Sequence, residues 1–158
     1  MLAKIRLHKA GMGYTLPALV DLVKFDESSI RERLVDYGCD YDSKLLIVAI
    51  DDWNIQRTLT LDEAYSIRDL VRDVYGGDEF LVCHLLQKQL PVSEILSLRY
   101  VFLSKDEEEC MIKVSKYYEA DALVHLFFKM KTWGNFMCAF IVTGHILNTS
   151  RGFYFKVK

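Results

Sequence analysis

The sequence predicts an α+β protein, because strand-like and helix-like hydrophobic periodicities occupy different parts of the 158-residue chain. Near the N terminus, residues 2–8 alternate apolar and charged side chains, as a half-buried strand does. In the middle, Ser or Thr followed three residues later by Glu repeatedly precedes helical spacing, which is the capping-box pattern. After residue 121 the apolar runs shorten and favour strands again.

The first part of the chain predicts a strand, a turn, a strand, a helix and a strand. The turn is Gly11-Met12-Gly13, and residues 16–25 form the second strand, which Pro17 delays or moves to a sheet edge. Ser29 and Glu32 form the first capping box. The helix that follows carries an apolar stripe and ends at Gly38; its stripe consists of Ile30, Leu34 and Tyr37. Residues 45–50 are a continuous apolar strand.

The middle of the chain predicts a small helical bundle. Thr60 and Glu63 form the second capping box, at the start of a helix that Gly76-Gly77 ends near residue 75. Its buried stripe is expected to be Ala64, Ile67, Leu70, Val71 and Val74. Residues 80–90 are apolar on nearly all sides and predict a central, buried helix, and Pro91 separates this helix from a further segment at 94–103.

The last part predicts one helix and a small antiparallel sheet. Ser104 and Glu107 form the third capping box, and the helix stripe is expected to be Cys110, Met111, Val114, Tyr117 and Tyr118. Residues 140–147 and 153–157 are expected to be strands. The predicted organisation is therefore an N-terminal α+β subdomain (1–58), a central helical subdomain (59–103) and a C-terminal α+β subdomain (104–158).

The charge of the chain is unevenly distributed, although the formal net charge is only −2. All 22 acidic residues fall between Asp21 and Asp121, a span with 12 basic residues, so its charge is 12 − 22 = −10. Such asymmetry suits different partners on different surfaces, or it simply follows solvated helices. Four cysteines without paired spacing are typical of reduced thiols, and neither a signal peptide nor a membrane span is evident, so we expect a cytoplasmic protein.

No pattern of catalytic, metal-binding or cofactor-binding residues is evident. Cys83 and His84 are adjacent, a spacing that suits neither a helical ligand pair nor a zinc knuckle. The sequence contains neither a Gly-x-Ser-x-Gly elbow nor a Walker pattern, and Gly11-Met12-Gly13 lacks the third glycine of a dinucleotide loop. We therefore expect a noncatalytic protein without a cofactor.

Three ordered stretches resemble the ArdA-type antirestriction proteins of phages and mobile elements. They are residues 60–70 (TLDEAYSIRDL), residues 25–52 with their helix, strand and acidic end, and the closing segment from Trp133-Gly134-Asn135-Phe136 through Gly144-His145 to Gly152-Phe153-Tyr154. The resemblance covers most of the chain. It implies an elongated three-part layout, a homodimer, and a noncatalytic inhibitor that occupies the DNA groove of type I restriction enzymes in the bacterial cytoplasm by mimicking DNA phosphates.

The resemblance directs attention to the acidic residues. On the helix at 61–75, Asp62, Asp69 and Asp73 lie opposite the apolar stripe and span about 16 Å, a length over which duplex DNA carries on the order of ten phosphates. Acidic residues elsewhere extend this track. The candidate partner-binding surface is Asp36, Asp40, Asp42, Asp51, Asp52, Asp62, Asp69, Asp73, Asp78, Glu79, Glu107 and Glu108.

Two observations limit this interpretation. Acids in a first helical turn, such as those at 107–109, also favourably meet the helix macrodipole, and Glu109 can pair with Lys113. In addition, the near-neutral charge departs from the strongly acidic family, since arginines punctuate the acidic span; they are Arg31, Arg33, Arg57, Arg68 and Arg72. The target is therefore a restriction enzyme or another defence nuclease complex, such as a CRISPR effector.

Two alternative functions remain open at the level of sequence. One is an anti-CRISPR or other interaction module that binds through an apolar or strand-edge surface, for which Phe153-Tyr154-Phe155 is the candidate edge. The other is a DNA-binding regulator whose basic, aromatic C-terminal segment contains Lys129, Lys131, Arg151, Lys156 and Lys158. A sequence pI near 6.1 disfavours direct DNA binding.

Overall fold

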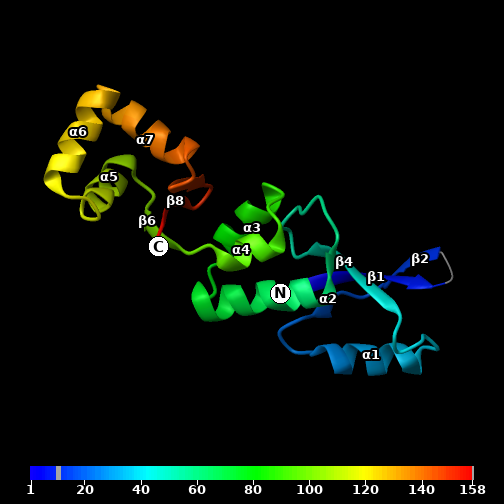
Figure 1. Ribbon diagram of the computed structural model, residues 1–158. Coiled ribbons are helices and arrows are strands. Elements are labelled where there is room, and N and C mark those ends of the chain that lie inside the picture. The colour runs from blue at the N-terminus through cyan, green and yellow to red at the C-terminus, as the bar shows by residue number, and fades with distance from the viewer. Residues whose placement is uncertain (10–11, 158) are drawn as a thin grey trace. The chain divides into compact units, whose positions relative to one another are not determined.

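The computed structural model, which describes residues 1–9 and 12–157, confirms the α+β class (Figure 1). The chain divides into two compact units, Met1–Leu96 and Ser97–Lys158. The sequence predicted three subdomains, with boundaries after residues 58 and 103. The helices of the predicted central subdomain belong to the first unit up to Leu96, and the helix at 61–69 contacts two strands of the N-terminal sheet. Gly11 and Lys158 lie outside the described residues.

The first unit combines a sheet with helices. Its elements are β1 (Leu2–Lys9), β2 (Met12–Thr15), β3 (Val20–Asp21), α1 (Glu27–Asp36), β4 (Lys44–Ile50), β5 (Leu59–Thr60), α2 (Leu61–Asp69), the π-helical turn η1 (Leu70–Val74), α3 (Glu79–Gln87) and α4 (Val92–Ser97). The sheet order is β2-β1-β4-β5, with β3 also paired to β1, and all of these pairings are antiparallel. Ser97, the last residue of α4, is the first of the second unit.

Strand β1 follows the predicted alternation. Ala3, Ile5 and Leu7 are buried, whereas the residues between them are exposed. The predicted second strand at 16–25 is wrong for most of its length, since only β3 pairs with β1 there. Asp21 explains the early end, because its carboxylate accepts a hydrogen bond from the Val23 amide at 3.0 Å and so turns the chain after two strand residues.

Helix α1 begins earlier than its predicted capping box. Its N-cap is Asp26, whose carboxylate accepts a hydrogen bond from the Ser29 amide at 2.8 Å, so the Ser29–Glu32 capping box is wrong. Ile30 and Leu34 are buried as predicted. Tyr37 is not part of the stripe: it follows the last helical residue and is 84% exposed.

Helix α2 confirms its predicted capping box. The Thr60 hydroxyl accepts from the Glu63 amide, and the Glu63 carboxylate accepts from the Thr60 amide. Ala64, Ile67 and Leu70 are buried, but Val74 is 44% exposed because the chain widens into η1 before Gly76 and Gly77 end the helix with positive φ. In α3 the buried side chains are Leu81, Val82, Leu85 and Leu86.

The second unit packs helices on a sheet of order β6-β8-β7. Its elements are β6 (Tyr100–Ser104), α5 (Glu107–Ser115), α6 (Ala120–Met130), α7 (Trp133–Val142), β7 (Ile146–Thr149) and β8 (Gly152–Lys156). The core of this unit consists of Leu103, Cys110, Met111, Val114, Phe136, Met137, Phe140, Ile146 and Phe155. Tyr117, expected on the buried stripe of α5, is 54% exposed because it lies beyond the last turn of the helix.

Three sequence predictions for this unit are wrong, the first being that the chain favours strands after residue 121, since α6 and α7 occupy most of residues 120–142. The N-cap of α5 is Asp106, whose carboxylate accepts from the Glu109 amide, whereas Ser104 is the last residue of β6 and hydrogen-bonds the Glu109 carboxylate instead. Residues 140–145 are not a strand, since α7 continues to Val142 and β7 begins only at Ile146. Within residues 1–9 and 12–157, none of the helices combines the length and apolar character needed to span a bilayer.

Candidate functional site

Three of the predicted acidic residues lie on a segment that the rest of the first unit holds in place. We call residues 36–42, between α1 and β4, the acidic loop; Asp36, Asp40 and Asp42 are all exposed on it. Arg31, which forms an ion pair with Glu27 at 2.6 Å, donates hydrogen bonds from its Nη1 atom to the carbonyls of Tyr41 (2.7 Å) and Ser43 (3.1 Å).

The aspartates of the acidic loop have no cationic partner among the described residues. Among the described residues, no Lys or Arg forms an ion pair with Asp36, Asp40 or Asp42, because the nearby Arg31 is engaged by Glu27 and by backbone carbonyls. The loop backbone is closed by a hydrogen bond from the Ser43 amide to the Asp40 carbonyl at 3.0 Å, and Gly38 has a φ of 77°. Backbone bonds thus order the loop while its carboxylates face solvent.

A second acidic group lies after β4. Asp51 has a structural role, since its Oδ1 atom accepts from the Leu2 amide at 2.9 Å and its own amide donates to the Leu2 carbonyl. Asp52 and Glu79, although 27 positions apart in sequence, both act on Cys83, whose pKa is raised first by burial and then by these two charges. Asp78 caps α3 by accepting from the Phe80 amide at 3.3 Å.

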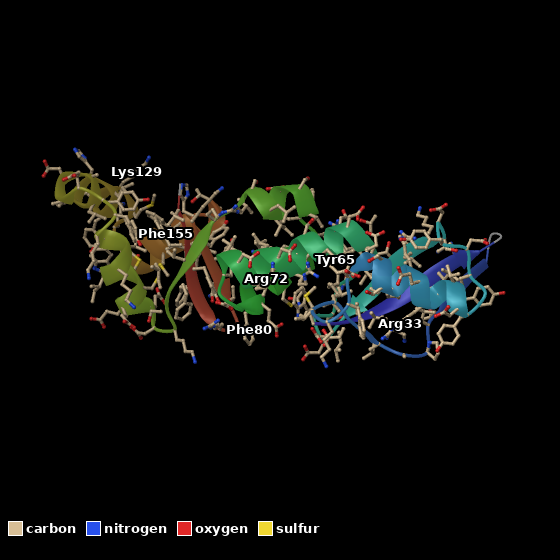
Figure 2. The ribbon with its side chains drawn as sticks, turned by 90° about the horizontal axis from the view of Figure 1, so that it is seen from below. Arg33, Tyr65, Arg72, Phe80, Lys129 and Phe155 are labelled. Atoms are coloured by element: carbon tan, nitrogen blue, oxygen red, sulfur yellow. The ribbon has the colours of Figure 1, made fainter. Side chains whose placement is uncertain are left out.

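The carboxylates on α2 and η1 do not form an unopposed track. Asp69 forms ion pairs with Arg68 (2.7 Å) and Arg72 (3.1 Å), and Asp73 pairs with Arg72 at 2.6 Å (Arg72 is labelled in Figure 2). The Arg72 hydrogen bonds hold the pKa of Asp73 below its ordinary value. Asp62 is exposed and has no ion pair with any described residue. This face therefore presents alternating charges rather than a row of anions.

The acidic loop and the Asp52 group lie at opposite ends of β4. Strand β4 has seven residues, which places its ends roughly 20 Å apart. Glu107 and Glu108 are exposed in the first turn of α5, in the second unit, and Glu109 beside them pairs with Lys113 at 2.8 Å. The predicted acidic residues are therefore in separate groups, and several of them have local structural partners.

The basic C-terminal segment differs from the arrangement that DNA binding requires. Phe155 is buried in the core of the second unit and Phe153 is partly buried against it, so neither offers a face for base stacking (Phe155 is labelled in Figure 2). The strand-edge alternative is also wrong at its predicted place, because β8 lies between β6 and β7 and both of its edges are hydrogen-bonded. Lys156 is exposed.

An apolar face of α6 is a feature that the sequence analysis missed. Every residue of α6 is described and none is fully buried; Phe128 is 76% exposed and Val124 is 55% exposed. Val124 and Phe128 are four residues apart and so share one helix face. Acidic Glu119 and Asp121 lie at the start of this helix, and Lys129 and Lys131 lie at its end. The i, i+4 spacing was readable once residues 120–130 were recognised as a helix.

The described residues contain no metal site, and the chain has no match that would assign it a function. Within residues 1–9 and 12–157, no cluster of His, Cys, Asp and Glu side chains has the arrangement of a metal site. The pKa of His84 is lowered, first by burial and then by the charge of Lys88. No protein-family model, no curated protein and no solved structure matches the chain.

Proposed function

We propose that this chain is a noncatalytic anti-defence protein of a phage or mobile element, which binds a host nuclease complex and covers its DNA-binding surface. The observation that carries the proposal is the acidic loop, whose backbone Arg31 holds at Tyr41 and whose Asp36, Asp40 and Asp42 are exposed and free of ion pairs to described residues. Exposed carboxylates suit the Lys and Arg side chains that otherwise contact DNA phosphates, and long-range attraction speeds encounter. The resemblance to ArdA-type proteins supports a type I restriction enzyme as the target.

The structure narrows the surface that we assign to this function. Asp52 and Asp62 join the acidic loop as exposed carboxylates of the first unit without ion pairs to described residues. Asp69 and Asp73 contribute little net charge because Arg68 and Arg72 balance them. Asp51 and Asp78 bond backbone amides, and Glu107 and Glu108 meet the α5 macrodipole. The partner surface is therefore a small number of carboxylates, on the acidic loop and at the opposite end of β4, rather than a continuous DNA-like track.

The test is a triple variant of the acidic loop, Asp36→Asn with Asp40→Asn and Asp42→Asn. Folding should survive, because these side chains are exposed and removing a negative charge at the end of α1 favours the helix dipole. We expect binding to a purified type I restriction enzyme at low salt to weaken by about tenfold or more, since three attractive charges are lost.

The control removes acidic charge without touching the loop. The pair Glu107→Gln and Glu108→Gln lowers the negative charge in the second unit and should leave binding within about twofold of wild type, because these carboxylates lie outside the acidic loop and exposed charges act weakly. Equal losses of affinity in both variants would show that the net charge of the protein, and not the acidic loop, governs binding to the enzyme. Undiminished binding by the loop variant would exclude the proposal.

We further propose that the protein is a homodimer formed through α6. If two copies of α6 pack antiparallel about a two-fold axis near position 125, Asp121 of each copy lies beside Lys129 of the other. The same arrangement brings the exposed Val124 and Phe128 of both copies together and removes them from water. A two-fold dimer also presents two acidic loops to the target.

A second candidate function is an anti-CRISPR or other interaction module that binds through an apolar surface. The observation that favours it is the same exposed face of α6, which could meet a foreign partner instead of a second copy. The acidic-loop variant distinguishes the two functions, because it should not affect binding through α6. The direct DNA-binding alternative has less support, since Phe153 and Phe155 pack inward and the sequence pI is near 6.1, although Phe128 is exposed.

A further inference from the structure

A pocket of about 470 Å³ lies in the first unit between residues 16–20 and helix α1. Tyr37 and Cys39, which belong to the acidic loop, also line it. Hydrogen bonds fix both ends of the covering segment, from the Leu16 amide to the Ile5 carbonyl and from the Leu22 amide to the Met1 carbonyl. The volume is within the range of small-molecule sites. The pocket is therefore a built feature of the fold.

The interior of the pocket is apolar. Ile30 and Leu34, which are 4% and 5% exposed, contribute the α1 wall, and Phe25 contributes another. The covering segment adds Leu16 and Leu19, of which Leu19 is 55% exposed. An apolar ligand body that displaced water from these side chains would be stabilised by roughly 25 cal/mol for each Å² that it buries.

Arg33 is the one charged residue among those that line the pocket, and it is available to a ligand. Its guanidinium stacks on the Phe25 ring at 4.0 Å from the ring centroid, which leaves the in-plane N–H donors directed sideways. No carboxylate among the described residues forms an ion pair with Arg33, whereas Arg31, on the same helix, has Glu27 as its partner. An arginine without an ion-pair partner can bind a carboxylate through two parallel hydrogen bonds, the geometry that guanidinium favours.

We propose that this pocket binds a small monocarboxylate with an unbranched apolar body, of the medium-chain fatty-acid class. The alkyl chain occupies the space between residues 16–20 and α1, and the carboxylate pairs with Arg33 at the mouth. The Arg33 guanidinium, the one charged group among the lining residues, favours this class over apolar cations and neutral apolar molecules, against the opposing charge of the nearby acidic loop. The proposal does not depend on any nuclease partner, but it shares Tyr37 and Cys39 with the acidic loop.

The test uses Cys39, a half-buried thiol that lines the pocket, as a reporter of occupancy. The full-length protein is alkylated with iodoacetamide in increasing decanoate, below the micelle concentration, and each cysteine is followed by peptide mass spectrometry. Decanoate should slow alkylation of Cys39 saturably, by about tenfold, while Cys138, exposed in the other unit, reacts at an unchanged rate. Calorimetric titration with decanoate gives the dissociation constant directly.

Variants and a reversed-charge ligand decide the role of Arg33. Arg33→Gln should weaken decanoate binding by about tenfold, whereas Arg6→Gln, a matched change at an exposed arginine outside the pocket, should leave it unchanged. Decyltrimethylammonium should neither bind nor protect Cys39. The proposal is overturned if the cation protects Cys39 equally, if Arg33→Gln binds decanoate as wild type does, or if decanoate gives neither heat nor protection.

Discussion

At the scale of single residues, identical carboxylates have different roles that depend on what lies beside them. Asp69 and Asp73 pair with Arg72, although the sequence analysis placed both in an open acidic track. The role of Arg31 was not predictable, because it binds carbonyls 10 and 12 residues away and no local pattern reports such a contact. Residue type alone therefore overestimates the extent of the acidic surface.

Gly152 is a residue whose replacement should destabilise the second unit. Its φ is 138°, and an added Cβ atom would collide with the carbonyl oxygen of Ser104. We expect Gly152→Ala to lower the free energy of unfolding by at least about 2 kcal/mol, measured by urea denaturation. Gly134→Ala is the control, because Gly134 lies in α7 with no atom within 4 Å of the added methyl group, so stability should stay equal or rise slightly.

The cysteines should differ sharply in reactivity. Burial raises the pKa of Cys110 to about 11, so below that pH the group is mainly the unreactive thiol, whereas Cys138 is exposed. At pH 8 a thiol reagent should modify Cys138 readily and Cys110 only when the protein unfolds. The measurement is peptide mass spectrometry after timed labelling, and rapid native-state labelling of Cys110 would contradict the described core.

At the scale of elements, the sequence predicted strands and helices well where the chain has one buried face. Strand β1 alternates and α2 has its capping box, and both are confirmed. Helix α7 was missed over its whole length, and residues 140–142 were predicted to be strand, because its apolar side chains surround the helix and conceal the 3.6-residue period. Its N-cap Thr132 accepts from the Asn135 amide, but Asn at that position does not complete a capping box.

We predict that Phe128→Glu, a change on the exposed face of α6, converts the protein to a monomer. The change places a buried charge in the proposed dimer interface, whereas in the monomer position 128 is solvent-exposed and tolerates Glu. Sedimentation velocity over a concentration series measures the assembly state. The control is Val23→Glu, at an apolar residue of the first unit that is 63% exposed, and it should leave the dimer intact. A wild-type monomer at all concentrations would refute the α6 interface.

At the scale of the whole molecule, a net charge of −2 conceals an acidic middle and basic ends. The composition predicted this asymmetry, but it could not predict which acids are neutralised, because that depends on the contacts that each arginine makes in the fold, such as those of Arg31 with Glu27 and with two backbone carbonyls. The function that we propose depends on the few carboxylates of the first unit without ion pairs to described residues. The affinity of the protein for its partner must therefore depend strongly on ionic strength.

The most direct measurement is competition between this protein and duplex DNA for a purified type I restriction enzyme, at about 50 mM and about 200 mM salt. The protein should displace the DNA at low salt, and its own affinity for the enzyme should fall several-fold at high salt, because exposed charges are screened. Binding that leaves the DNA in place, or an affinity that does not change with salt, would contradict charge-based occupation of the DNA-binding surface.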